Sequence, residues 1–234
     1  MTDAATTHDV LFRLRQLCWI ALVAAVFALI DSDFVIVLVA LIAIAIAAFE
    51  TREPVRALGL GRPPSIARTI ALGVVVGFAM LFLSKLLLTP IAEAITGVPR
   101  DLSAFEDVRG NAPAYLRLMP RIWLGAAICE EMVFRGFLIG RLEAAFGGAS
   151  RVATAAAVLL ASALFGLAHT YQGPTGVLIT GTLGLIFACV YAYGGRKLWL
   201  NIVVHGVYDT LSLGLVLTSF DKTFTALGHR LVPF

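Results

Sequence analysis

Apolar residues gather in seven long stretches that are separated by polar segments. These stretches cover residues 11–30, 34–49, 66–89, 121–141, 152–169, 176–193 and 198–217. A helix needs about 20 mostly apolar residues to span a bilayer. The pattern therefore predicts an all-α polytopic membrane bundle with about seven transmembrane helices. Because no internal repeat or low-complexity linker interrupts it, we expect a single membrane domain over residues 1–234. Residues 1–117 would hold the N-terminal spans and a long outer loop, and residues 118–220 a core of helices that carry polar side chains.

Composition supports a membrane protein. Hydrophobic residues make up 59% of the chain and charged residues 14%, whereas soluble domains are nearer 45–50% and about 25%. The net charge is only +3, and no basic run with interleaved aromatic residues indicates nucleic-acid binding. Cys18, Cys129 and Cys189 lie in apolar stretches without a CxxC spacing, so we interpret them as small buried side chains.

The loop charges predict an orientation, since cytoplasmic loops carry an excess of Lys and Arg. Alternate loops hold the basic residues Arg13, Arg15, Arg52, Arg56, Arg62, Arg68, Arg141, Arg151, Arg196 and Lys197. The opposite side holds the short turn with Asp31, Ser32 and Asp33, the loop 90–120 and the C-terminal tail. We therefore expect a multi-pass plasma-membrane protein with a cytoplasmic N-terminus. The mixed charges of the long outer loop suit a helix that lies on the surface.

The fourth stretch contains two adjacent carboxylates, Glu130 and Glu131, near its middle. Charges inside a membrane are costly and are functional candidates by default. Glu131 and Arg135 are four residues apart and can pair on one face of a helix. Adjacent residues point about 100° apart, so this pairing leaves Glu130 unpaired. A lone carboxylate in an apolar setting suits general acid/base chemistry.

The fifth and seventh stretches carry the two histidines at membrane depth. Phe165 and His169 share one face near the end of the fifth stretch. His205 and Asp209 are again four apart on the seventh, with Asn201 one turn earlier. A carboxylate beside an imidazole fixes its tautomer and raises its basicity. We expect Asp209 to lie behind His205 in this way.

Two chemistries fit these residues. One is a His₂Glu zinc site with Glu130, His169 and His205 as ligands around a bound water. The other is metal-free, with Glu130 and His169 activating water while His205 and Asp209 orient or stabilise the oxyanion. No HExxH helix is present. A polar seam that only joins helices through side-chain hydrogen bonds is the structural alternative.

In their order and spacing, the three motifs resemble those of the CPBP family of intramembrane proteases. That family comprises type II CAAX prenyl endopeptidases and bacterial Abi-like relatives, with the pattern EExxxR, FxxxH and HxxxN or HxxxD on spanning helices. The matching residues are Glu130, Glu131, Arg135, Phe165, His169, His205 and Asp209. The resemblance implies an intramembrane endopeptidase of the CAAX-type or bacteriocin-processing kind. It gives catalytic roles to Glu130, Glu131, His169, His205 and Asp209, and supporting roles to Arg135, Phe165 and Asn201.

The family also implies the partners and the cofactor. The partners are membrane lipid and a peptide or protein substrate. The cofactor is zinc or another divalent metal, unless the mechanism is metal-free. Gly173 stands where eukaryotic members carry a further His or Asn, so this chain looks more like the bacterial members, and a bacterial inner membrane is expected.

Two other functions remain open from the residues. Buried Glu, Arg and His also serve proton relays in ion-coupled transporters, although no inverted repeat of the transporter kind is found in the sequence. A non-catalytic immunity or scaffold protein is the third possibility. The sequence leaves the substrate, the metal and the oligomeric state open.

Overall fold

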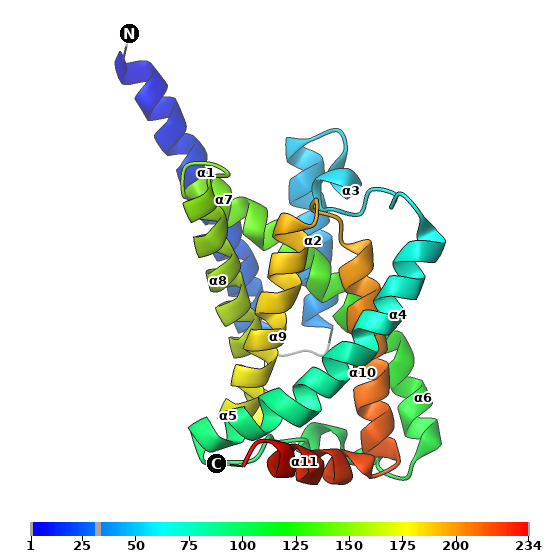
Figure 1. Cartoon of the computed structure of the whole chain (residues 1–234). Coiled ribbons are helices and arrows are strands. Elements are labelled where there is room, and N and C mark those ends of the chain that lie inside the picture. Colours follow the sequence, from blue (N-terminus) through cyan, green and yellow to red (C-terminus); the bar gives the residue numbers. More distant parts are fainter. Residues whose placement is uncertain (1, 31–33, 234) are drawn as a thin grey trace.

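The protein is an all-helical bundle in the computed structural model, which describes residues 2–30 and 34–233 (Figure 1). No strand occurs in these residues, which confirms the predicted all-α class. The helices are α1 (Thr2–Leu29), α2 (Val35–Glu50), α3 (Pro54–Ala57), α4 (Ile66–Phe82), η1 (Leu83–Leu88), α5 (Thr89–Thr96), η2 (Ser103–Val108), α6 (Ala112–Pro120), η3 (Arg121–Ile139), α7 (Gly140–Ala145), α8 (Arg151–Leu167), η4 (Thr170–Gln172), α9 (Gly173–Tyr193), α10 (Trp199–Leu217) and α11 (Phe220–Leu231). The turn predicted at Asp31, Ser32 and Asp33 lies outside the described residues.

All seven predicted apolar stretches are helical, but they differ in length and polarity. Within the described chain, four continuous helical segments are long and apolar enough to cross a membrane: Thr7–Phe27, Ile66–Thr96, Thr170–Tyr193 and Trp199–Leu217. Helices α2 and α8 are apolar but shorter, and η3 carries the charged motif. Seven spans are therefore not confirmed. The third stretch also continues beyond its predicted end at Thr89, because η1 and α5 extend the helix to Thr96.

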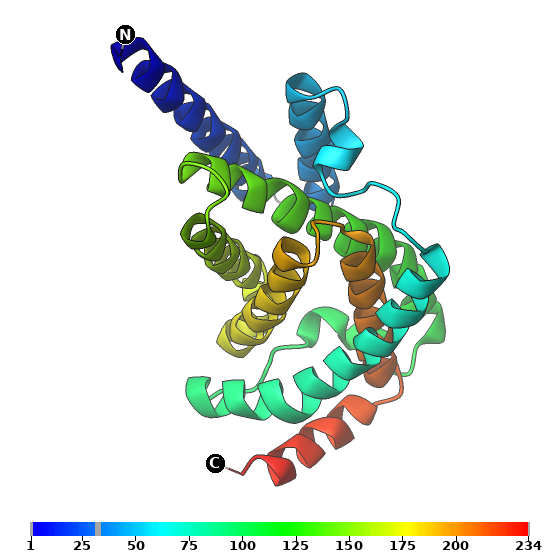
Figure 2. The same cartoon turned by 45° about the horizontal axis from the view of Figure 1, so that its top comes forward.

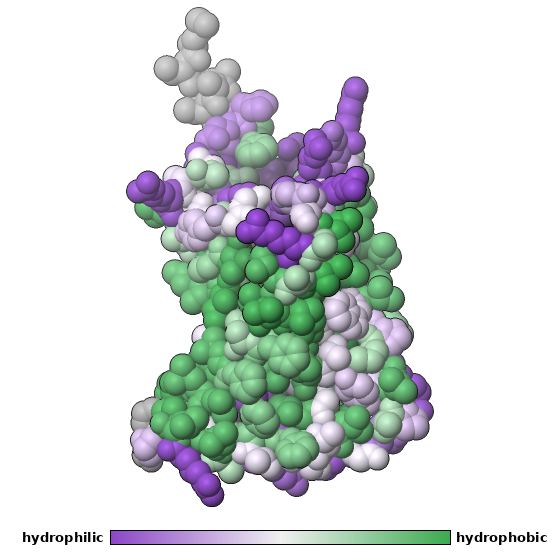
Figure 3. Space-filling view, turned by 45° about the vertical axis from the view of Figure 1, so that its right-hand side comes forward, coloured by the Kyte–Doolittle hydropathy of each residue, from purple (hydrophilic) through white to green (hydrophobic). Residues whose placement is uncertain are grey.

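The surface shows where lipid would lie. A broad hydrophobic band surrounds the middle of the molecule in the face seen in Figure 3, and hydrophilic side chains gather above it. Large apolar side chains are exposed on α1, α4 and α8, among them Leu11, Val75 and Val152. Exposed apolar patches of this size mark contact with a membrane or another protein. Together with the long apolar helices, this band indicates a multi-pass membrane protein.

Helices η3, α9 and α10 lie in the middle of the bundle, α8 packs beside α9, and α4 crosses α10 on the outside (Figures 1 and 2). Small residues allow this crossing. A Cβ atom on Gly73 would lie 2.4 Å from Val203 Cγ1, and one on Gly77 would lie 2.6 Å from Val207 Cγ1. Small residues at such crossings let helix backbones approach closely in membranes. The packing of α4 therefore fixes the helix that carries His205.

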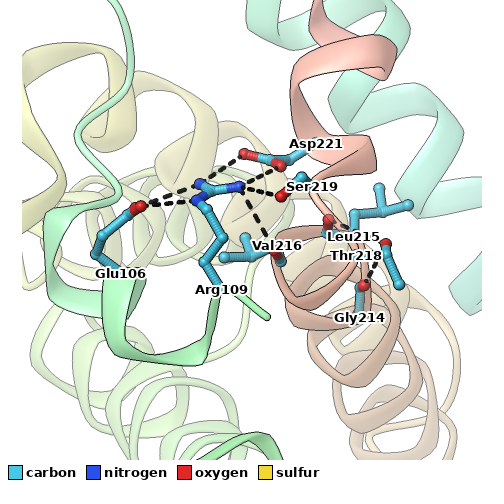
Figure 4. Close-up of polar contacts among 8 residues, drawn as sticks. All are labelled: Glu106, Arg109, Gly214, Leu215, Val216, Thr218, Ser219 and Asp221. Carbon is cyan, nitrogen blue, oxygen red and sulfur yellow. Dashed lines mark hydrogen bonds and ion pairs between the residues drawn. The ribbon is translucent and has the colours of Figure 1, made fainter. Parts of the chain in front are cut away.

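The long loop between the third and fourth stretches carries its own short helices, as its length and charges predicted. They are α5, η2 and α6, and they lie with α11 at one end of the bundle (Figure 1). Arg109, which follows η2, joins this loop to the start of α11. Its guanidinium donates to both carboxylate oxygens of Asp221, at 2.9 and 3.2 Å, and to Glu106 at 2.7 Å (Figure 4). This bidentate geometry is the strong form of an Arg–carboxylate contact, so α11 is held against the loop.

Candidate active site

Glu131 is the centre of a buried hydrogen-bond network that connects three elements. Its side chain is 0% exposed and accepts a 3.0 Å bond from Arg135, one turn further along η3. The Glu131 carboxylate also contacts two residues of α10, His205 through Nδ1 at 3.0 Å and Asn201 through Nδ2 at 3.2 Å. Buried charges persist when they are paired and their remaining hydrogen-bonding atoms are satisfied. The predicted Glu131–Arg135 pair is thus confirmed, and Glu131 additionally positions the His205 ring.

Arg135 extends this network to α8 and α9. It donates to the carbonyl oxygen of Gly184 at 3.1 Å, and its guanidinium carbon lies 4.3 Å from the centre of the Phe165 ring. A Cβ atom on Gly184 would lie 2.8 Å from Phe165 Cδ1 and 3.3 Å from Arg135 Nη2. Glycine at this position therefore gives the arginine access to the α9 backbone. Helices η3, α8 and α9 therefore meet at this side chain.

Glu130 has the opposite environment to Glu131. Its Oε2 atom is buried and has no hydrogen-bond partner among the described residues. The nearest charged neighbour is His205, whose Nε2 lies 4.0 Å from that oxygen, and the Glu130 side chain keeps 18% of its surface exposed. Buried unsatisfied polar atoms are rare and call for an explanation, such as a catalytic role or a bound water. The unpaired state expected for Glu130 is therefore what the structure shows.

Asp209 does not lie behind His205 as predicted. Its Oδ2 is 3.3 Å from Nε2 of His205, which is the same nitrogen that faces Glu130. The opposite nitrogen, Nδ1, is held by Glu131. The four-residue spacing correctly predicted the His205–Asp209 contact, but it carries no information on which nitrogen is used. Both nitrogens of His205 thus face carboxylates, and both donate when the ring is protonated.

His169 reaches the same region through Phe165. The centre of the Phe165 ring lies 4.7 Å from the centre of the His169 ring and 6.2 Å from that of the His205 ring. His169 Nδ1 is 2.8 Å from the carbonyl oxygen of Phe165. Because a carbonyl can only accept, Nδ1 carries the hydrogen and Nε2 is left with a lone pair in the neutral ring. No direct contact joins His169 to Glu130 in the described chain.

Several residues around the site were not singled out from the sequence. Phe187 stacks on His205 at 5.3 Å, and its carbonyl accepts from Asn201 at 2.9 Å. Tyr171 lies 5.7 Å from His169 between ring centroids. Tyr208, next to Asp209, shares a 3.0 Å hydrogen bond with Ser84 of η1. Aromatic and hydroxyl side chains are common in apolar helices, so only the position of Tyr208 beside Asp209 could have indicated its place.

The residues as arranged do not form the three-ligand set that the metal hypothesis needs. Among the residues described, no three His, Cys, Asp or Glu side chains are placed to hold one ion. His205 uses Nδ1 on Glu131, and its Nε2 already faces two carboxylates. His169 contacts neither Glu130 nor His205 through a ring nitrogen in this part of the chain. We therefore derive no step through a metal ion.

The structure thus describes a multi-pass membrane protein with a cluster of acidic and basic side chains inside its helix bundle. Residues 112–211 match the family model of Rce1-like type II CAAX prenyl endopeptidases. This segment runs from α6 into α10 and contains all three motifs. This segment is similar to Rce1-like domains, which confirms the resemblance found in the motifs. Searches of curated proteins and of solved structures found no match.

Proposed function

We propose that this chain is an intramembrane endopeptidase that hydrolyses a peptide bond of a membrane-associated substrate, with Glu130 as the general base. The observation that carries the proposal is the buried, unpartnered oxygen of Glu130 beside an imidazole whose orientation is fixed from the other side. A candidate base must reach the proton that it abstracts, directly or through one water. The Oε2 atom of Glu130 is free to accept a hydrogen bond from a water, whereas both carboxylate oxygens of Glu131 already accept from protein groups.

The remaining groups take complementary roles in this mechanism. Glu130 accepts a proton from water, and the resulting nucleophile attacks the substrate carbonyl carbon. His205, oriented by Glu131, donates through Nε2 toward the oxyanion, the arrangement that stabilises such intermediates most. Asp209 also contacts Nε2 of His205, and its negative charge offsets the positive charge of the protonated His205 ring. The proton that Glu130 took from water then passes to the leaving nitrogen as the C–N bond breaks. His169 can relay it, because Nε2 has a free lone pair while Nδ1 is held by the Phe165 carbonyl.

The test is cleavage of a degenerate peptide library by the detergent-purified protein. We expect Glu130→Gln to abolish cleavage at normal folded yield, since the amide preserves shape but is no base. The matched control is Glu53→Gln, which changes an exposed glutamate on the loop before α3. Cleavage that persists in Glu130→Gln removes the proposal. Complete loss of wild-type cleavage with a chelator, restored by adding zinc, would contradict the metal-free form of it.

A further inference from the structure

A second polar cavity lies apart from the candidate active site, at the end of the bundle that carries α5, η2 and α11. Its volume is about 530 Å³, and its walls come from η1, α5, the loop before η2 and α11. This is far more space than a single bound water needs. The titratable residues that line the cavity are Lys85, Glu93, Arg100, Asp221, Lys222 and His229. None of them was singled out as a site residue from the sequence.

Lys85 is the most unusual of these side chains. It lies within the membrane-length helix Ile66–Thr96, is only 4% exposed, and lines the cavity without a hydrogen bond or ion pair to any residue that the structure describes. A buried cation without a partner is costly, and ionisable residues inside membrane helices are functional candidates. The ammonium group of Lys85 therefore calls for an anion that the chain itself does not supply.

Arg100 provides a second unsatisfied donor in the lining. Its Nε donates to Gln172 Oε1 at 2.9 Å, and its Nη2 donates to the same oxygen. The remaining nitrogen, Nη1, is buried and has no partner in the described part of the chain. An N–H group that is buried without an acceptor loses its bonds to water and gains nothing in return. A ligand with several acceptor oxygens would satisfy Arg100 and Lys85 together.

The carboxylates of the cavity are already used by other groups. Both oxygens of Asp221 accept from Arg109, at 2.9 and 3.2 Å (Figure 4). Glu93 contacts His229 Nε2 at 2.7 Å and the backbone N–H of Arg100 at 3.4 Å. The cavity therefore has an excess of positive charge, which favours an anionic ligand.

The position of the cavity indicates where this anion comes from. Helix α11 is amphipathic: Phe220, Leu227 and Leu231 are exposed on one face, whereas the opposite face, with Lys222 and His229, lines the cavity. Helices of this kind lie in the plane of the membrane interface. Helices α9 and α10 each have one end at this level (Figure 1). The cavity thus lies at the depth of the lipid headgroups, just outside the hydrocarbon core.

We infer that this cavity binds the phosphate group of an anionic membrane phospholipid. Lysine and arginine form charge-assisted hydrogen bonds with phosphate oxygens, which are stronger than neutral ones. A headgroup without its own amine fits better than a zwitterionic one, because the amine would bring another cation into a cavity that already has an excess of positive charge. The interfacial depth favours a lipid over a soluble phosphate ion, since the membrane holds its phosphates at this level.

The experiment measures lipid binding by native mass spectrometry in a neutral detergent. Phosphatidylglycerol is compared with phosphatidylcholine of the same acyl chains. We expect wild-type protein to bind phosphatidylglycerol about tenfold more tightly or better, the factor that one charge-assisted hydrogen bond supplies. Lys85→Met should remove this preference, and Lys85→Arg should keep it. Lys197→Met changes an exposed lysine at the opposite end of the bundle, and this matched control should behave as wild type.

Thermal unfolding of the same proteins separates a lost site from a lost fold. A ligand that binds only the folded state raises the unfolding temperature, so phosphatidylglycerol should stabilise wild type and leave Lys85→Met unchanged. Without lipid, Lys85→Met should unfold at no lower temperature than wild type, because methionine fills irregular apolar space and removes an unpartnered charge. If Lys85→Met does not fold, Arg100→Gln replaces it and should lose the same preference.

Three outcomes would overturn the lipid site. They are equal affinity of wild type for the two lipids, equal affinity of wild type and Lys85→Met for phosphatidylglycerol, and stabilisation by inorganic phosphate alone that matches that by phosphatidylglycerol and is lost in Lys85→Met. The last outcome would assign the cavity to a soluble phosphate. None of these measurements depends on cleavage, so the lipid site and the proposed endopeptidase function can fail separately.

Discussion

At the scale of single residues, two adjacent glutamates of η3 have been given opposite environments. Glu131 has three side-chain partners, whereas Glu130 keeps one buried oxygen without any. Consecutive helix positions point in different directions, so one carboxylate can join the helices through hydrogen bonds while an oxygen of its neighbour stays without a partner. The same division applies to His205, which uses one nitrogen for structure and presents the other to Glu130 and Asp209.

Removing one partner of the Glu131–Arg135 pair should destabilise the protein. The two side chains are 0% and 1% exposed, and breaking a buried pair costs about 3–5 kcal/mol in soluble proteins. We expect Glu131→Ala and Arg135→Ala each to lower folded yield and thermal stability in detergent. The double variant should be less damaging than the sum of the two single changes, as for coupled residues generally.

An exposed ion pair provides the control for that experiment. Arg56 and Glu53 are 3.0 Å apart with side chains 77% and 63% exposed, and pairs of this kind contribute about 0–1 kcal/mol. Arg56→Ala should leave the unfolding temperature nearly unchanged. If Arg135→Ala behaved like Arg56→Ala while Glu130→Gln unfolded the protein, the roles of the two glutamates would be reversed.

Asp209→Ala should reduce cleavage without reducing folded yield. The Asp209 side chain is 26% exposed and contacts only one nitrogen of His205, while Glu131 still holds the other. Losing such an orienting partner typically costs about 10–100-fold in activity. The measurement is kcat/KM on a cleaved peptide alongside His205→Ala, which should be far more severe. An effect of Asp209→Ala equal to that of His205→Ala would indicate that Asp209 itself contacts the reacting groups.

At the scale of elements, close helix crossings determine where the site residues can meet. Gly206 lies on α10 directly after His205, and a Cβ atom there would lie 2.5 Å from the Trp123 ring of η3. Glycine thus brings α10 close enough to η3 for His205 to reach both glutamates. Gly166 of α8 approaches α9 in the same way, since its Cβ would lie 2.7 Å from the carbonyl oxygen of Val177.

Gly73→Ala should disturb the site from the outer face of α10. The added methyl would overlap Val203, and overpacking of this kind costs about 1–3 kcal/mol. We expect a lower unfolding temperature and reduced cleavage, because α10 carries His205 and Asp209. Gly140→Ala is the matched control, since nothing lies within 4 Å of its added Cβ. Equal stability of the two variants would mean that the α4–α10 crossing does not support the site.

Helical periodicity predicted the parts of the site that lie within one helix. Pairs four residues apart were correct for Glu131 with Arg135 and for His205 with Asp209. Contacts between helices depend on crossing geometry, which one sequence does not contain. For this reason the bond from Asn201 to Glu131 was not predicted.

The same limit applies to the ends and partners of the spanning helices. Lys85 was not singled out from the sequence although it lies inside the third stretch, and its neighbours from α11 and from the loop before η2 come from distant segments. Apolar composition located all seven helical stretches, whereas their ability to cross a membrane also depends on helix length and on charge. The short helices α2 and α8 and the charged η3 therefore left the number of spans unresolved.

At the scale of the whole molecule, the two ends of the bundle differ in charge and in construction. One end carries the N-terminus, α3 and the turn between α9 and α10, and the other carries α5, η2 and α11 (Figure 1). At the first end, Arg141 donates to Glu50 and to Gln16, and Arg196 binds Glu143 at 2.6 Å. The predicted basic loops thus lie together at one end. By the excess of basic residues, we propose that this end faces the cytoplasm.

Cysteine labelling in intact cells tests this orientation and the crossing of η3 together. In a background without the three native cysteines, single cysteines would replace Arg52, Asp107, Ala149 and Lys222, all exposed in the structure. We expect a membrane-impermeant maleimide to label positions 107 and 222 directly, and positions 52 and 149 only after permeabilisation. The reason is that the segment from α4 to α5 separates position 52 from position 107, and η3 separates position 107 from position 149.

Labelling with the two sets exchanged would reverse the orientation but keep the crossings. Labelling of 107 and 149 from the same side would show that η3 does not cross. In that case Glu130 would lie in a helix that enters and leaves on one face, and the site would be reached from that face alone.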